Sequence, residues 1–175
     1  MTKRQGVWPG LTKHRGHAVS RGAFPDALKL IPGTGDLMEL VAAVAAGRGR
    51  PITVLDCDLP ADAPSGLWLQ LAEVDYIVCA RSVSGEHRRV VICHEIAHML
   101  LGHQPQDGGI DTSSIAPSID VDVAVRFFTR HGYEDDAEAD AESLATVLAS
   151  ELGSRKVAAL AALSRTQDNV SARLR

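Results

Sequence analysis

Apolar residues recur every three to four positions in four stretches of the chain, which is the period of a helix with a buried face. The pattern predicts helices over residues 37–46, 88–101, 135–152 and 155–164. Residue types that favour helix starts precede the first and the last of these stretches. Gly47, Gly102 and Gly153 follow the first three and are expected to end them.

Short runs rich in β-branched and aromatic residues predict three strands in the first half of the chain. The first covers residues 51–57, and the other two cover residues 66–71 and 74–80. Because the join between the second and third strands is very short, they are expected to form a hairpin. Helices and a small antiparallel sheet together predict an α+β fold.

The elements indicate one domain with a less regular segment at each end. Residues 1–33 are expected to be a flexible, solvated basic arm, since Gly and Pro are scattered among basic residues opposed by the single acid Asp26. Residues 34–165 form the single domain, and residues 166–175 are expected to fray. The basic residues of the arm are Lys3, Arg4, Lys13, Arg15, Arg21 and Lys29.

Two segments outside the predicted elements remain irregular or ambiguous. Gly, Pro, Asp and Ser are frequent in residues 104–117, which predicts an exposed loop. Residues 119–129 fit a strand as well as a helix, because alternation at their start gives way to helical spacing.

Composition and charge narrow the class of protein. The net charge of −4 gives no indication of direct nucleic-acid binding. The three cysteines, Cys57, Cys79 and Cys93, are widely spaced without a Cys-x-x-Cys pair, which fits a reducing compartment. Because no apolar run is typical of a secretion signal or a membrane span, we expect a soluble, cytoplasmic protein with no membrane partner.

The strongest chemical signal is the sequence His94-Glu95-Ile96-Ala97-His98. Two histidines four residues apart on a helix point the same way and can bind one metal ion. Glu95 lies beside them, where it can act as general base toward a metal-activated water. Almost every other residue of this helix is apolar, so burial of the polar trio would be costly without a divalent cation. A chance match is expected on a loop or an exposed helix instead.

The third metal ligand is not supplied by the same helix. A His-Glu-x-x-His-x-x-Gly-x-x-His motif would need glycine and histidine where the chain has Leu101 and Gln104, with Gly102 and His103 each displaced by one residue. The acidic run at residues 134–142 offers several carboxylates instead. A solvated helix start, where acids complement the helix dipole, explains most of these acids equally well.

The hairpin GLWLQLAEVDYIVCA, the helix VVICHEIAHMLLGH and the later acidic helix resemble the ImmA/IrrE family of zinc metallopeptidases. The resemblance covers roughly residues 35–152 and implies a minimal zincin-like domain that binds Zn²⁺. It implies that His94, His98 and Glu138 are the metal ligands, with Ala141 and Glu142 completing a Glu-x-x-Ala-polar motif. Asp136, Glu134 and Glu142 remain alternative third ligands. If the third ligand is Glu138, then Glu142 lies one helical turn after it and can accept a hydrogen bond from a ligand histidine.

The resemblance further implies a zinc-dependent endopeptidase whose protein substrate is a DNA-binding repressor. The alternative is a zinc-bearing module that docks on a transcriptional regulator without cleaving it. A deformylase-like hydrolase would need a cysteine ligand in a glycine-rich context, which Cys57 and Cys79 lack. The oxyanion donor has three candidates, namely His103, His131 and Tyr133.

Overall fold

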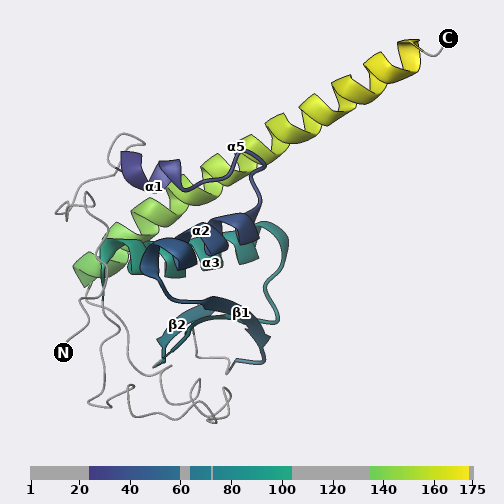
Figure 1. Ribbon diagram of the computed structural model, residues 1–175. Coiled ribbons are helices and arrows are strands. Elements are labelled where there is room, and N and C mark those ends of the chain that lie inside the picture. The colour runs from purple at the N-terminus through teal and green to yellow at the C-terminus, as the bar shows by residue number, and fades with distance from the viewer. Residues whose placement is uncertain (1–23, 60–63, 72, 104–134, 174–175) are drawn as a thin grey trace.

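A computed structural model describes residues 24–59, 64–71, 73–103 and 135–173, and it has helices on one side of a three-stranded sheet (Figure 1). Helix α3 lies between the sheet and α5 and contacts both of them. Helix α2 contacts α3 and β1, and the short α1 contacts α5. The elements are α1 (Pro25–Lys29), α2 (Leu37–Arg48), β1 (Ile52–Cys57), β2 (Gly66–Gln70), β3 (Asp75–Ala80), α3 (Gly85–Leu101) and α5 (Asp135–Arg173).

The sheet confirms the hairpin but is not wholly antiparallel. Strands β2 and β3 pair antiparallel from Gly66 opposite Cys79 to Gln70 opposite Asp75, as the short join predicts. Strand β1 pairs parallel with β3, so the sheet order is β1-β3-β2 and the sheet is mixed. The predicted antiparallel sheet is therefore wrong for β1. Strand β3 is buried on both faces, which suits a central strand.

Helix α3 is buried along most of its length, as its apolar sequence predicts. It begins at Gly85, three residues before the predicted start, and ends at Gly102, whose φ of 70° closes the helix in the left-handed region. From Val91 to Leu101 its side chains are buried, except for the half-buried His94. The helix therefore carries the motif against the sheet on one side and α5 on the other.

The N-terminal part of the described chain belongs to the core, which contradicts the predicted arm. Phe24, Ala27 and Ile31 are at most 3% exposed and lie in the main hydrophobic cluster. The Arg155 guanidinium of α5 donates hydrogen bonds to the carbonyl oxygens of Leu28 and Ile31. The arm predicted for residues 1–33 is therefore wrong from residue 24 onward, and residues 1–23 lie outside the described chain.

Helix α2 begins where the sequence predicts and ends slightly later. The Asp36 carboxylate caps it by accepting hydrogen bonds from the backbone N–H groups of Met38 and Glu39, at 2.7 and 3.0 Å. Gly47 lies inside the helix, and Gly49 ends it with a φ of 65°. Of two nearby glycines, only the one that adopts a left-handed conformation acts as the stop.

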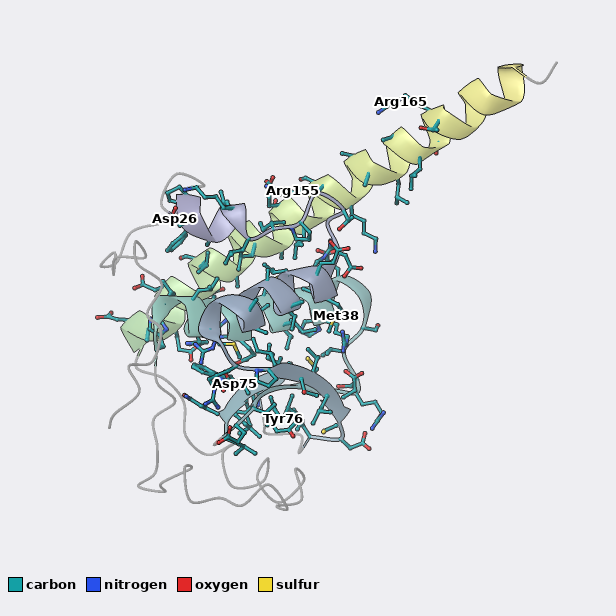
Figure 2. All side chains as sticks on the ribbon, in the orientation of Figure 1. Asp26, Met38, Asp75, Tyr76, Arg155 and Arg165 are labelled. Carbon is teal, nitrogen blue, oxygen red and sulfur yellow. The ribbon has the colours of Figure 1, made fainter. Side chains whose placement is uncertain are left out.

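Helix α5 is continuous where two helices are predicted. Gly153 does not end it, and the Ser154 hydroxyl donates to the Ser150 carbonyl oxygen at 3.0 Å inside the helix. A Cβ atom at Gly153 would lie 3.1 Å from the Arg89 guanidinium, so the glycine leaves room for the end of that side chain. The C-terminal half extends past the other elements (Figure 1), and Arg165 lies far out on this part of the helix (Figure 2). Leu160, on the same half, is exposed. The predicted fraying from residue 166 is also replaced by helix, up to Arg173.

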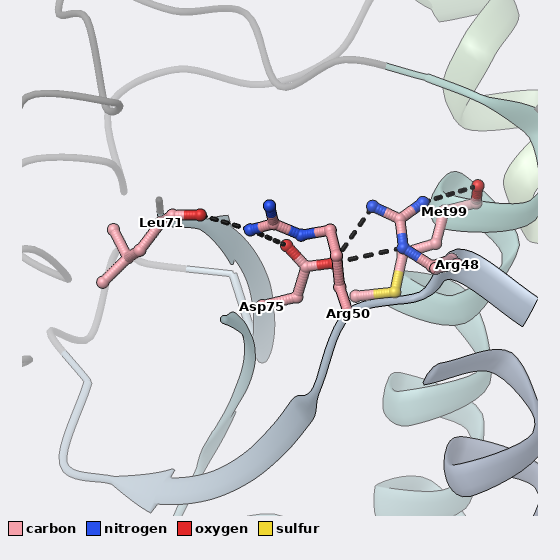
Figure 3. Close-up of polar contacts among 5 residues, drawn as sticks. All are labelled: Arg48, Arg50, Leu71, Asp75 and Met99. Carbon is pink, nitrogen blue, oxygen red and sulfur yellow. Dashed lines mark hydrogen bonds and ion pairs between the residues drawn. The ribbon is translucent and has the colours of Figure 1, made fainter. Parts of the chain in front are cut away.

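A buried ion pair joins α2 to the sheet and to α3 (Figure 3). Asp75, at the start of β3, is fully buried and lies 3.0 Å from the Arg48 guanidinium and 3.4 Å from that of Arg50. Arg48 also donates to the carbonyl oxygen of Met99 in α3 at 3.3 Å, and its guanidinium lies 5.0 Å from the ring centre of Trp68. These contacts fix α3 relative to the strands that face its motif.

No helix of the described residues has a stretch long and apolar enough to cross a lipid bilayer. The loop predicted for residues 104–117 and the ambiguous residues 119–129 lie outside the described chain.

Candidate metal centre

The two histidines of the motif point to one place on α3. The Nε2 atoms of His94 and His98 are 3.0 Å apart, and their rings meet edge-on with centroids 4.7 Å apart. His98 is fully buried, whereas the His94 side chain is 28% exposed. The convergence follows from the four-residue spacing on a regular helix.

Helix α5 brings Glu138 to the same place, as the predicted register requires. Its carboxylate oxygens lie 3.2 Å from Nε2 of His94 and 3.7 Å from Nε2 of His98. The three residues form a group that could hold a metal ion, with one ligand atom from each and all of these atoms within 4.8 Å of one another. Among the alternatives, Asp136 and Glu142 are exposed and lie outside this group, and Glu134 lies outside the described residues.

The donor atoms fit a small divalent cation. Nitrogen and oxygen ligands about 2.0–2.2 Å from a tetrahedral ion lie about 3.3–3.5 Å from one another. The two Nε2 atoms are 3.0 Å apart, and the nearest Glu138 oxygen to each, Oε2 for His94 and Oε1 for His98, lies at 3.2 and 3.7 Å, close to that range. Two imidazoles and one carboxylate are also the ligand set of open catalytic zinc sites.

A third histidine, His103, is in hydrogen-bond contact with the second ring nitrogen of His98, Nδ1. Their Nδ1 atoms are 3.0 Å apart, and both side chains are buried. Gly102 turns the chain after α3, which brings the His103 backbone N–H to within 3.0 Å of the His98 carbonyl oxygen. When Nε2 of His98 is a ligand, the Nδ1 atom of His98 carries the proton. This N–H donates a hydrogen bond to Nδ1 of His103, which fixes the tautomer and the ring orientation of His98.

Burial and the neighbouring imidazoles keep His98 neutral. Desolvation, followed by the His94 and His103 rings, lowers the pKa of His98 from 6.5 to about 3. A neutral imidazole with a free Nε2 lone pair is the form that binds a metal. His103 is one of the three candidate oxyanion donors, and it is buried against the Nδ1 atom of His98. The other two candidates, His131 and Tyr133, lie outside the described residues. The Gly102 turn directly before His103 is the signal that could have indicated the contact with His98.

Glu95 lies beside the triad and faces the sheet. It is 5% exposed, and the backbone N–H of Trp68 in β2 donates a hydrogen bond to its carboxylate. A Cβ atom at Gly66 would lie 3.0 Å from the Glu95 Oε1 atom, so glycine leaves room for the carboxylate. Burial, and next the Glu138 charge, raise the pKa of Glu95 from 4.5 to about 8, against the lowering effect of the Trp68 N–H. Glu95 can therefore hold or release a proton near neutral pH.

A pocket of about 390 Å³ opens beside the triad. Its walls come from β2 and the residues before it, from α3, and from α5, and they include His94, Glu95 and Glu138. His87, which the sequence motif does not include, also lies on the wall, about two helical turns before His94 on α3.

Glu142 also lines this pocket. Within the described chain its carboxylate has no hydrogen bond to a ligand histidine, and the contact of the His98 Nδ1 atom is with His103. His103, and not Glu142, is thus the described residue in hydrogen-bond contact with Nδ1 of His98.

No protein-family model, curated protein or solved structure gives a significant match to the chain. The candidate metal site therefore rests on its own residues, His94, His98 and Glu138, which could hold a metal ion, with Glu95 and His103 beside them.

Proposed function

We propose that the chain is a zinc-dependent metalloendopeptidase of the ImmA/IrrE type. The observation that carries the proposal is the convergence of His94 and His98 from α3 with Glu138 from α5, next to the buried carboxylate of Glu95. A structural zinc site has four protein ligands, whereas a group of three leaves a position open for chemistry. The metal is assigned as Zn²⁺ from the ligand types, because imidazole with one carboxylate suits zinc better than calcium or magnesium.

A zinc ion held by these residues would acidify water and polarise a carbonyl oxygen. Glu95 acts as general base and then as general acid. Its carboxylate accepts a proton from the attacking water as the new C–O bond forms. It returns that proton to the amine nitrogen as the C–N bond breaks. Without a metal, burial and the Glu138 charge raise the pKa of Glu95 to about 8, and a bound cation would lower it again, which leaves the carboxylate ionised to accept the proton.

Strand β2 gives a reason to expect an extended peptide as substrate. It pairs with β3 on one side, and within the described residues its other edge has no strand partner. Gly66, at the start of this strand, lies beside Glu95 and in the pocket wall. A substrate strand laid along this edge would pass the open position of the triad. The resemblance of the motifs indicates a DNA-binding repressor in the cytoplasm as the protein that is cut.

The proposal is tested by incubating the zinc-loaded protein with DNA-binding regulators encoded beside its gene. We expect a single cut in one of them, loss of cleavage after chelation, and loss of cleavage in Glu95→Gln with zinc still bound. Asp136→Asn is the matched control, since it removes an exposed acid of the same helix that lies outside the metal-binding group. Stable binding of a regulator without cleavage would support the docking module instead.

A further inference from the structure

We propose that the pocket beside the metal triad selects a substrate residue with a basic side chain, lysine or arginine, and that Glu142 binds its cationic end. This inference rests on the proposed peptidase function and names the substrate class of the same site. It makes Glu142 a specificity-determining residue.

Glu142 is placed to face the substrate. It lies one helical turn after Glu138 on α5, so both carboxylates project on the same side of the helix, and both line the pocket. The Glu142 side chain is exposed and has no hydrogen bond or ion pair with another described residue. Other acids near the motif are paired, such as Glu86 with Arg89 and Asp56 with Arg88. Glu142 is thus available to a ligand.

The walls around Glu142 suit the aliphatic part of a long side chain. Pro64, Leu67, Val90 and Val91 line the same pocket, and Val90 is 40% exposed. Lysine and arginine bury their methylene groups on apolar surface while the charged end stays at a polar group. A free amino terminus has the same charge but no methylene stem, so these walls favour a side chain over an N-terminal amine.

The charge of the pocket points the same way. Glu138 belongs to the group that could hold the metal, and Glu95 is the proposed catalytic base. Glu142 is therefore the carboxylate of the pocket wall that remains for a substrate group. No lysine or arginine lines the described part of this pocket, where the basic side chains are His87 and His94. A substrate cation is the group that would complement Glu142.

The test uses binding to hydroxamates, which chelate zinc, as well as cleavage. Two series are compared on the zinc-loaded protein, with the variable side chain on either side of the chelating group and either lysine or its uncharged analogue norleucine at that position. We expect the lysine compound of one series to bind the wild type about two- to fivefold more tightly, as an exposed ion pair allows. We expect Glu142→Gln to lose this preference. Asp140→Asn, a nearby acid of α5 that does not line the pocket, should keep it.

Equal binding of lysine and norleucine compounds in both series, or an unchanged preference in Glu142→Gln, would overturn the inference. A preference that disappears when the amino terminus of the compound is acetylated would assign Glu142 to an N-terminal amine and overturn it as well. A lysine preference in a protein that cleaves no peptide would refute the peptidase, and with it the selection of a substrate residue, and would leave Glu142 only as a binding site for a basic side chain. Cleavage without a lysine preference would refute only the inference, and failure to bind zinc would refute both.

Discussion

Glu95→Gln should make the metal-free protein more stable at neutral and alkaline pH, although it removes the proposed catalytic base. The pKa of Glu95 is raised from 4.5 to about 8 by burial and by Glu138. The folded protein therefore keeps a proton that the unfolded chain has lost. Stability from this group is intact below pH 4.5, falls as the pH rises toward about 8, and is constant above that. Glutamine has the same shape, can accept the Trp68 N–H bond, and carries no charge.

The magnitude follows from the two pKa values. At about 1.4 kcal/mol for each tenfold change in a protonation equilibrium, the rise from 4.5 to about 8 costs the wild type about 5 kcal/mol at high pH. At pH 7 the same rise costs about 3 kcal/mol, and at pH 5 about 1 kcal/mol. The stability gained by Glu95→Gln should therefore increase by about 3.5 kcal/mol between pH 5 and pH 8.

Urea unfolding of both proteins in a chelator, at several pH values from 5 to 8, measures this difference. Titration of His98, whose pKa is lowered to about 3, affects both proteins and cancels when their free energies of unfolding are subtracted. Zinc should narrow the gap, because a nearby cation favours the ionised carboxylate. Parallel stability curves for the two proteins across this pH range would refute the buried, proton-holding state of Glu95.

Three further substitutions test the surroundings of the site. His103→Phe should weaken zinc binding by about 10- to 100-fold in a chelator competition, because His98 loses the group that orients its ring; unchanged affinity would contradict that role. Asp75→Ala should cost about 2–3 kcal/mol in urea unfolding, below the usual cost of breaking a buried pair because the two arginines keep some contact with water. Gly66→Ala should cost about 1–3 kcal/mol and lower peptide cleavage, because the added methyl group displaces α3 and Glu95; a silent substitution would show that β2 and α3 can separate freely.

The convergence of the candidate metal ligands could be predicted because the information is local or nearly so. A four-residue spacing on an apolar helix fixes the convergence of His94 and His98. The register of Glu138 came from a motif resemblance, and the structure places its carboxylate at both histidines. The spacing of the acids along α5 does not show which of them faces the histidines. That depends on which face of α5 packs against α3, a helix that is distant in the sequence.

The features that were missed depend on contacts between distant segments. Periodicity does not encode which neighbour β1 pairs with, so its parallel alignment with β3 was not predictable from the strand pattern. Gly153 looks like a helix stop, but it lies inside α5, with the end of the Arg89 side chain close by. Phe24 lies among basic residues in the sequence, yet it is buried in the main hydrophobic cluster. Local sequence gives no measure of such long-range burial.

Zinc affinity of the wild type, Glu138→Gln and Asp136→Asn, measured side by side in competition with a chromogenic chelator, tests the metal centre most directly. We expect the wild type to bind one zinc ion per chain, Asp136→Asn to bind it equally well, and Glu138→Gln to lose most of its affinity, since its carboxylate lies 3.2 Å from the His94 ring. A wild type that binds no zinc, or a Glu138→Gln variant with unchanged affinity, would contradict the assignment of His94, His98 and Glu138 as a metal site.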